Sequence, residues 1–280
     1  MNTLYLVATP IGNLEDITVR ALRVLKEVAL IAAEDTRRAR VLLTRLQIHT
    51  PLTSYFEHNK SQKLDALLAA LERGDVAIIS EAGTPGISDP GYELVRAALA
   101  RHARVVPIPG ASAITTALVA SGLPSDQFVY LGFLPRQKNA RRKFLRARAN
   151  ESRTLIAFEA PHRVRAALED IAATLGNRQI CLAREMTKMF EEFFRGTVED
   201  ARAHCAQHAP RGEFTLVIGE MKTESGKQKA KSAEDWTEVK VRAAVKRLIA
   251  RGRSRTDAVK QVARASGRER RAVYKLVVSH

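Results

Sequence analysis

The sequence predicts an α/β protein with two α/β domains and a small all-α, helix-turn-helix-like domain at its C-terminal end. Three observations support this prediction. Strand-like apolar runs alternate with helical stripes through the first 220 residues, which favours sheets covered by helices. A polar segment at 222–235 is typical of a linker. Three short amphipathic stripes rich in Lys and Arg follow it at 236–280.

The N-terminal domain is assigned to residues 1–121 and is expected to hold a parallel sheet. Its strand-like runs are Thr3–Thr9, Leu30–Ala33, Val76–Ile79 and Val105–Ile108. Its helical segments are Leu22–Val28, Leu64–Leu71, Tyr92–Leu99 and Ala111–Val119. Each strand is followed by a helix, as parallel pairing requires. A Gly-Leu-Pro turn at 122–124 marks the predicted boundary.

The second domain is assigned to residues 122–221 and has a mixed α/β pattern. Five strands are expected, at Phe128–Phe133, Thr154–Phe158, Gln179–Ala183, Glu192–Arg195 and Phe214–Ile218. Two helices are expected, at Val164–Leu175 and Val198–Gln207. In the C-terminal domain, stripes begin at Val241, Val259 and Val273, and Ser254 with Asp257 has capping-box spacing.

Charge is concentrated in two segments of the chain. The net charge is +16, and residues 222–280 hold 17 Lys and Arg against 6 Asp and Glu, a net of +11. A second basic run, Arg136–Arg148, has seven Lys and Arg and no acid. Such segments indicate a polyanionic partner, most simply nucleic acid, although a solvated basic surface gives the same pattern. The expected RNA contacts are Arg141, Arg142, Lys143, Arg268, Arg271 and Lys275.

Composition excludes several classes of protein. Two cysteines, Cys181 and Cys205, are too few for a disulfide framework or a cysteine-ligated zinc site, and no ligand spacing suggests another metal. Only 5% of residues are aromatic, which argues against an RNA-stacking sheet. No apolar stretch approaches the ~20 residues that span a bilayer. The N-terminus lacks a signal-peptide pattern, so we expect a cytoplasmic protein.

Three small-residue loops follow strands of the predicted parallel sheet. The segment Ser80–Gly91 (SEAGTPGISDPG) contains three glycines, and the loops Thr9–Asn13 (TPIGN) and Pro109–Ala113 (PGASA) end two other strands. Because ligands bind at the carboxyl ends of parallel strands, we expect one crevice there. Asp35 is expected to cap the helix after the second strand, and Asp89 with Pro90 to begin a later helix.

Taken together, these motifs resemble the tetrapyrrole methylase superfamily, the class III S-adenosylmethionine-dependent methyltransferases. The motifs VATPIGNLEDITVRAL, AEDTR, SEAGTPGISDPG, PGASA, LGFLPR, HR, AREMTK, EEFFRG and GEFTLVI occur in family order over residues 3–220. The likeness is greatest to a subfamily that 2′-O-methylates a cytidine (cytidine 1402) in the decoding region of 16S ribosomal RNA. One departure is Glu81, where the family pattern has Asp.

The resemblance implies a donor site between the two α/β domains, and a homodimer that needs no metal or membrane. The partner it implies is 16S ribosomal RNA or the small ribosomal subunit. The positions matching the family's contacts to S-adenosyl-L-methionine are Pro10, Ala82, Gly83, Thr84, Ile87, Ser112, Ala113, Phe158, Glu159, Met186, Phe214 and Thr215.

A ribose hydroxyl needs a base to become a good nucleophile. Glu81 and Asp35 are the predicted base candidates, and Arg37 with His162-Arg163 are candidates to orient a phosphate.

Two alternative functions stay open at this point. One is a methyltransferase acting on a tetrapyrrole ring with the same fold. The other is a non-enzymatic helix-turn-helix regulator, which the strand-end loops disfavour.

Overall fold

The computed structural model describes residues 2–56, 60–89, 91–221, 236–266 and 268–278. The chain divides into two compact units, residues 1–221 and 222–280. This division falls where the sequence predicts the linker to begin, although the linker itself, 222–235, lies outside the described residues. No helix within the described ranges is long and apolar enough to cross a membrane.

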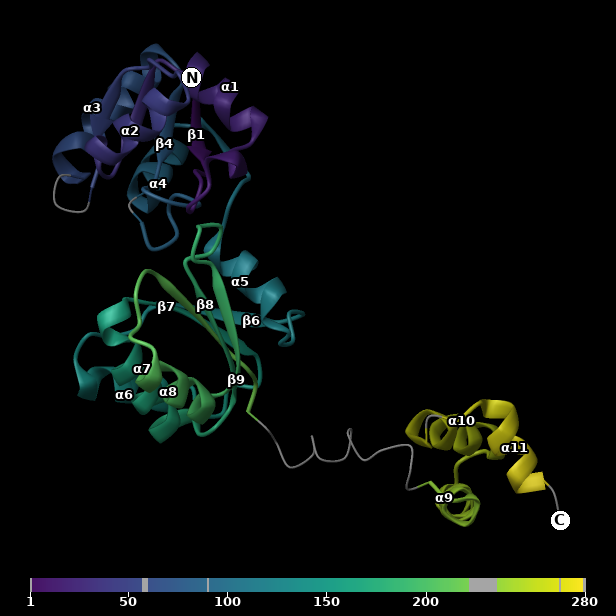
Figure 1. The fold of residues 1–280 in the computed structure, drawn as a ribbon. Coiled ribbons are helices and arrows are strands. Elements are labelled where there is room, and N and C mark those ends of the chain that lie inside the picture. The colour runs from purple at the N-terminus through teal and green to yellow at the C-terminus, as the bar shows by residue number, and fades with distance from the viewer. Residues whose placement is uncertain (1, 57–59, 90, 222–235, 267, 279–280) are drawn as a thin grey trace. The chain divides into compact units, whose positions relative to one another are not determined.

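The first sheet, whose strands β1 and β4 are labelled in Figure 1, is five-stranded and entirely parallel, in the order β3-β2-β4-β1-β5. Its strands are β1 (Thr3–Val7), β2 (Leu30–Ala33), β3 (Leu52–Ser54), β4 (Val76–Ile79) and β5 (Arg104–Ile108). The predicted parallel sheet is confirmed. Strand β3 was not predicted, because three residues beside Pro51 carry no readable alternation.

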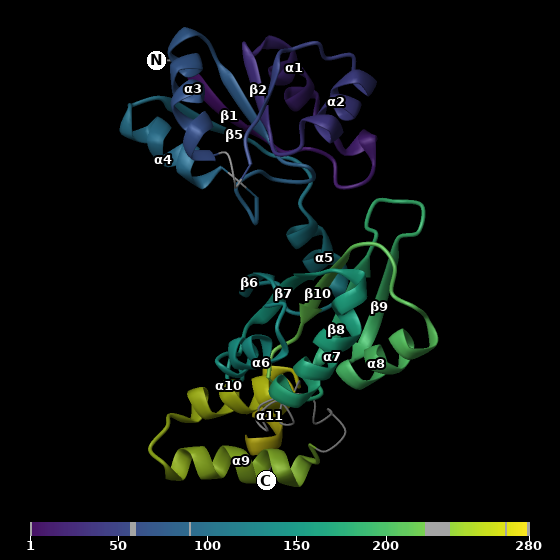
Figure 2. The same cartoon turned by 90° about the vertical axis from the view of Figure 1, so that its left-hand side faces the viewer.

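Two helices cover each face of this sheet. They are α1 (Val19–Glu27), α2 (Thr36–Arg45), α3 (Lys60–Arg73) and α4 (Tyr92–Ala100), and Figure 2 shows α1 and α2 on one side and α3 and α4 on the other. Along β4, Ala77 and Ile79 pack towards α1 and α2, while Val76 and Ile78 pack towards α3 and α4. Side chains that alternate between two apolar layers explain why the strand is continuously apolar.

The second sheet is mixed, in the order β6-β7-β10-β8-β9. Its strands are β6 (Phe128–Phe133), β7 (Thr154–Glu159), β8 (Gln179–Arg184), β9 (Glu192–Thr197) and β10 (Phe214–Ile218). Only β6 and β7 pair in parallel, and the other three pairings are antiparallel. The sequence prediction of a mixed α/β arrangement is therefore confirmed.

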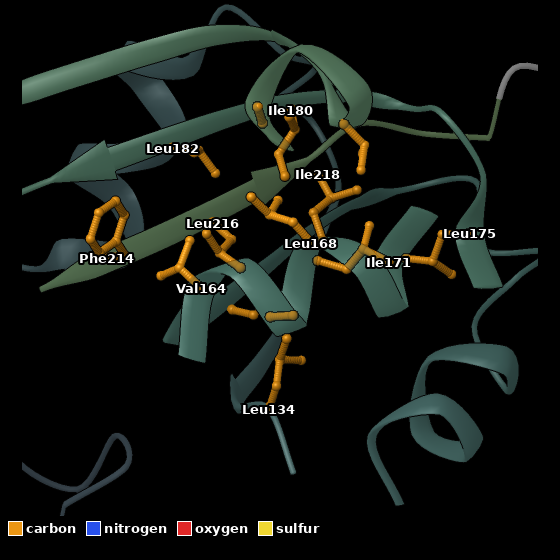
Figure 3. Close-up of a cluster of buried hydrophobic side chains, with 14 of the residues drawn as sticks. Leu134, Val164, Leu168, Ile171, Leu175, Ile180, Leu182, Phe214, Leu216 and Ile218 are labelled. Atoms are coloured by element: carbon orange, nitrogen blue, oxygen red, sulfur yellow. The ribbon is translucent and has the colours of Figure 1, made fainter. Parts of the chain in front are cut away.

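Three helices cover one face of the second sheet: α6 (Lys138–Arg146), α7 (Pro161–Leu175) and α8 (Val198–Gln207). Figure 3 shows Val164, Leu168 and Ile171 of α7 beside Leu216 and Ile218 of β10, and all five are fully buried. Their i, i+4, i+7 spacing places the three α7 side chains on one helical face.

The opposite face is covered by α5 (Ala113–Ser121), whose Ile114, Ala117 and Leu118 pack on Ile156 and Val217 (Figure 1). The sequence placed this helix at the end of the first domain. Its packing places it on the second sheet, while the domain boundary at residue 121 stays a prediction. The predicted start of the helix at Ala111 is also two residues early.

The C-terminal unit consists of α9 (Glu238–Ala250), α10 (Arg255–Ser266) and α11 (Arg270–Val278) around a small apolar core. Ser254 Oγ accepts from the amide of Asp257 at 3.1 Å and donates to its carboxylate at 2.7 Å, so the predicted capping pair forms. Arg268, one of the expected RNA contacts, is half-buried. Arg268 precedes α11 and donates to the carbonyl oxygen of Trp236 at 2.8 Å.

Candidate functional site

Hydrogen bonds join the three strand-end loops of the first sheet. The amide of Thr9 donates to the carbonyl of Gly83 at 2.9 Å, and the amide of Gly83 donates to the carbonyl of Thr9 at 3.0 Å. Ser80 Oγ donates to the Gly83 carbonyl at 3.1 Å, and Thr84 Oγ1 donates to the carbonyl of Ala111 at 3.5 Å. The predicted convergence of these loops at one edge of the sheet is therefore confirmed.

A cavity of about 390 Å³ opens beside the joined loops, within the size range of small-molecule sites. It is bounded by the loops of the first sheet and by the ends of β7 and β10 in the second. It is lined by Ile11, Glu81, Ala82, Gly83, Thr84, Ile87, Ser88, Asp89, Ser112, Ala113, Ile114, Phe133, Phe158, Glu159, Ala160, Pro161, Glu213, Phe214 and Thr215.

The cavity brings together most of the predicted donor-binding positions. Two of the twelve are not in its lining. Pro10 is buried, and Met186 packs with Ile114 in the core beneath α5. The sequence did not single out Phe133 or Ser88, both of which line the cavity. Their signal was weak, because a strand-end Phe and a loop Ser are common in any α/β protein.

Gly83 leaves the backbone bare at the cavity wall. Its φ is +80°, a conformation that favours glycine, and an added Cβ would lie 3.4 Å from Cγ2 of Ile11 and 3.6 Å from the carbonyl oxygen of Ala111. Gly110 serves packing instead, since a Cβ there would lie 2.9 Å from Cβ of Ala8. Gly83 thus gives a ligand access to the backbone, and Gly110 lets two segments of backbone pack closely.

Apolar side chains form part of the lining and are partly exposed to it. Ile87 is 41% exposed and Phe133 is 57% exposed, although both are large hydrophobic residues. The ring of Phe158 packs edge-on against Tyr130 and Phe133, with centroid distances of 5.2 and 5.6 Å. Exposed apolar surface within a cavity indicates a ligand with an apolar or aromatic portion.

Glu159 supplies a fixed carboxylate at the base of the cavity. Its side chain is fully buried, accepts from the amide of Ala160 at 2.9 Å and is paired with Arg163 at 3.1 Å. Burial raises the pKa of Glu159, and Arg163 opposes that rise. Arg163 also donates to the carbonyl of Leu134, so it braces the site and is not free to orient a phosphate. His162 is exposed beside it, in an open hollow that shares Phe133 and Ala160 with the cavity.

Three carboxyl groups gather at the edge of the cavity: Glu34, Glu81 and Asp89. Burial, together with the charges of Glu34 and Glu81, raises the pKa of Asp89 to about 7. Burial and Glu81 also raise the pKa of Glu34. Glu81 is paired with Arg38 at 2.5 Å. Like charges this close favour retention of a proton, so the group holds one near neutral pH.

The structure tests two aspartate assignments. Asp89 does not cap α4, because Gly91 occupies the N-cap position with φ at +152°. Asp35 caps α2 as predicted, accepting from the amides of Arg37 at 2.8 Å and Arg38 at 3.4 Å. The bonds from Arg37 lower the pKa of Asp35 to about 2, which makes it a poor proton acceptor. These bonds assign Asp35 to helix capping, and its role as a base stays a prediction.

Among the predicted RNA contacts of the basic run, Arg141 is buried and only 4% exposed. It pairs with Asp170 at 2.6 Å and donates to the carbonyls of Pro135 and Arg136. Arg142 pairs with the same carboxylate at 2.6 Å. The assignment of Arg141 to RNA is a correction, since its donors are used inside the fold. Lys143 is exposed, as are Arg271 and Lys275 in the C-terminal unit.

No group of three or more His, Cys, Asp or Glu side chains within the described ranges is placed to hold a metal ion.

Comparison with solved structures places the fold among methyltransferases. Diphthine synthase superposes with a TM-score of 0.63 over 78% of this chain and 90% of its own, at 13% identity. Uroporphyrin-III C-methyltransferase from Thermus thermophilus, complexed with S-adenosyl homocysteine, gives 0.55 over 79% and 98%, at 22% identity. At these identities the likeness concerns the fold alone.

Sequence relatives are much nearer. A Halalkalibacterium halodurans protein named ribosomal RNA small subunit methyltransferase I is 48% identical over 277 residues, 98% of this chain and 94% of its own. A Synechocystis protein of that name is 45% identical over 99% of this chain and 97% of its own. A Thermotoga maritima protein, also so named, is 48% identical over 219 residues that make up 98% of its own length but 78% of this chain.

The family model for tetrapyrrole (corrin/porphyrin) methylases matches residues 3–202. That match covers the first sheet, strands β6 to β9 of the second sheet and all three loops around the cavity. The chain therefore belongs to the tetrapyrrole methylase family.

Proposed function

We propose that this chain is an S-adenosylmethionine-dependent methyltransferase that modifies ribosomal RNA of the small subunit. In its finer form, the reaction transfers a methyl group to the 2′-hydroxyl of a cytidine in 16S ribosomal RNA. The observation that carries the proposal is the cavity at the three joined loops, in a chain nearly half identical to proteins named for this activity.

The residues present fit the methyl donor. The bare backbone at Gly83 and the neighbouring Thr84 suit its zwitterionic amino-acid end, because amide and carbonyl groups can face both of its charges. The exposed faces of Ile87 and Phe158 suit its adenine and thioether portions. When bound, S-adenosylmethionine supplies a sulfonium-activated methyl group, which makes positioning a major part of catalysis.

The protein must also accept the proton of the ribose hydroxyl. Glu81 and Asp89 both line the cavity, and Asp89 has a pKa near the working pH of a general base. Glu81 is paired with Arg38 at 2.5 Å. We therefore retain Glu81 as a base candidate and add Asp89, which sequence reasoning assigned to helix capping.

We further propose that the enzyme acts in the cytoplasm as a homodimer and needs no metal ion. Met189 and Phe190, in the turn between β8 and β9, are 90% and 67% exposed. Exposed apolar side chains of this size favour contact with a second surface. Light scattering that gives a monomer mass at micromolar concentration would contradict the dimer.

The decisive experiment supplies purified protein with methyl-labelled donor and one of four acceptors. They are 30S subunits lacking the modification, deproteinised 16S RNA, a short RNA oligonucleotide and a tetrapyrrole. Nuclease digestion and mass spectrometry then locate the label. We expect 2′-O-methylcytidine, with subunits modified faster than the oligonucleotide because basic residues are spread over a broad surface. Label on the tetrapyrrole alone, or on no acceptor despite donor binding, would contradict the proposal.

A further inference from the structure

Helix α2 presents a row of arginines that the functional site does not account for. Its ten residues include four arginines and no acid. An open hollow on its exposed side is lined by Arg37, Arg40, Val41, Thr44 and Arg45. These positions are spaced three, four, seven and eight residues from Arg37, so they share one face of the helix. We call this set the α2 arginine face.

The α2 arginine face begins at the mouth of the cavity. Helix α2 follows β2, so its first turn lies at the carboxyl edge of the first sheet, where the three loops meet. Arg38, in that turn, is paired with Glu81, which lines the cavity. From Arg37 to Arg45 the helix rises by about 12 Å, which matches roughly three phosphates of one strand in a duplex.

Charge on this face is only partly neutralised. Arg37 is paired with Asp35 at 2.9 Å, yet its side chain remains 90% exposed. Arg40 and Arg45 are exposed, and neither forms an ion pair with any residue in the described part of the chain. On α6, Asp170 binds two arginines, and Lys138, Lys143 and Arg146 remain exposed. What distinguishes α2 is that its two unpaired arginines follow a first turn that is tied to the cavity lining by the pairing of Arg38 with Glu81.

The relatives provide a second reason to look for an RNA surface outside the C-terminal unit. The Thermotoga maritima protein is matched along 98% of its length by 219 residues, so about one fifth of this chain has no counterpart in it. The C-terminal unit, residues 222–280, is of that size. A protein of the same name is thus matched almost completely by a length of chain equal to that of the α/β unit.

We propose that the α2 arginine face binds the phosphate backbone of ribosomal RNA and holds the strand that flanks the target nucleotide against the cavity mouth. Guanidinium groups bind phosphate oxygens through paired hydrogen bonds, and Val41, which is 59% exposed, offers an apolar contact between them. This inference rests on the proposed function for the identity of its RNA.

The test replaces Arg40 and Arg45 together by Gln. The matched control replaces Lys26 and Arg104 by Gln, which removes the same charge at the amino edge of the same sheet, where α1 ends and β5 begins. All four side chains are exposed, so both variants should fold. A third variant, Arg40→Lys with Arg45→Lys, keeps the charge.

Binding to 30S subunits and to deproteinised 16S RNA is measured over a series of KCl concentrations. The Arg40→Gln, Arg45→Gln variant should show a log–log salt slope shallower by about 1.4–1.8, the loss of two phosphate contacts. The lysine variant should retain most of the slope, and donor affinity by calorimetry should stay within twofold. An unchanged slope, or an equal reduction in the Lys26 and Arg104 control, would overturn the inference. Failure of the proposed function would be distinguishable, because the unaltered chain would then methylate none of the ribosomal RNAs.

Discussion

Replacement of Asp89 by Asn tests whether the carboxyl cluster at the cavity shares a proton. Asp89 has its pKa raised from 3.8 to about 7 by burial and by the charges of Glu34 and Glu81. Between those pH values the folded protein holds a proton that the unfolded chain has released. Stability conferred by that proton is lost as pH rises, because the folded state then binds more protons than the unfolded state. Above pH 7 Asp89 is charged in the folded protein, and its full destabilising effect on the folded state is present.

The size of the effect follows from the shift. A rise of this extent corresponds to about 4 kcal/mol if no solvent screened it. Asp89 is only partly buried, and screening reduces the value to roughly 1–2 kcal/mol. Because Asn carries no charge, Asp89→Asn should raise the free energy of unfolding by that amount at pH 8 and leave it nearly unchanged at pH 4. For a unit of this size, the expected rise in Tm at pH 8 is about 2–8 °C.

The assay compares thermal unfolding of the parent and the variant across the pH range, with Asp126→Asn as the control. Asp126 is exposed and lies outside the cavity lining. Methylation of 30S subunits is measured in parallel. If Asp89 accepts the ribose proton, the parent's rate should rise through about pH 7, and the variant should lose that rise together with most of its activity. A more stable and less active variant is the expected combination.

Two outcomes would refute this reasoning. A Tm difference between parent and variant that does not change with pH would mean that the three carboxyl groups share no proton. Full activity with the parent's pH profile would remove Asp89 from catalysis and leave Glu81 as the base candidate.

Two further predictions concern the donor loop and the C-terminal unit. Gly83→Val should reduce donor affinity at least tenfold in calorimetry. The control Gly122→Val has a similar φ of +77° but open space around it, so it should lower stability and leave donor binding unchanged. Equal donor affinities in the two variants would contradict a role for the Gly83 backbone. Deletion of 222–280 should leave donor affinity within twofold of the parent value. It should make the log–log salt slope of RNA binding shallower by about 0.7–0.9 per lost phosphate contact. An unchanged slope would mean that those helices are a structural or dimer element.

Local patterns were enough to predict most of the fold. The apolar run Val76–Ile79 was predicted to be a strand, and in the structure its side chains pack into two layers. The three glycine-containing loops were predicted to meet because parallel strands share a carboxyl edge. What local patterns could not supply was the partner of α5. Its apolar face is compatible with either sheet, and only tertiary packing on Ile156 and Val217 decides between them.

Site residues that act through local backbone geometry were predicted well, and site residues that depend on neighbouring charges were predicted poorly. Gly83 and Thr84 belong to a loop whose geometry is local, so the motif located them. Asp89 precedes Pro90 in a cap-like sequence, but its environment is set by Glu34 from another loop and by Glu81 from the start of its own loop. No spacing along the chain indicates that those three carboxyl groups meet.

The arginines show the same division between what is local and what is not. The number of positive charges favoured Arg136–Arg148 as an RNA surface, because seven cations without an acid repel one another unless negative charge lies nearby. Asp170, which lies 29 residues beyond Arg141 in the sequence, supplies part of that negative charge. Its carboxylate is buried and binds two of the seven cations. On α2 the neighbouring acids, Asp35 and Glu81, bind only the first turn, and the next two turns keep their charge. The surface that remains for a polyanion is therefore set by which cations the fold has already paired, and on α2 the two left unpaired, Arg40 and Arg45, lie on the helix that begins at the cavity.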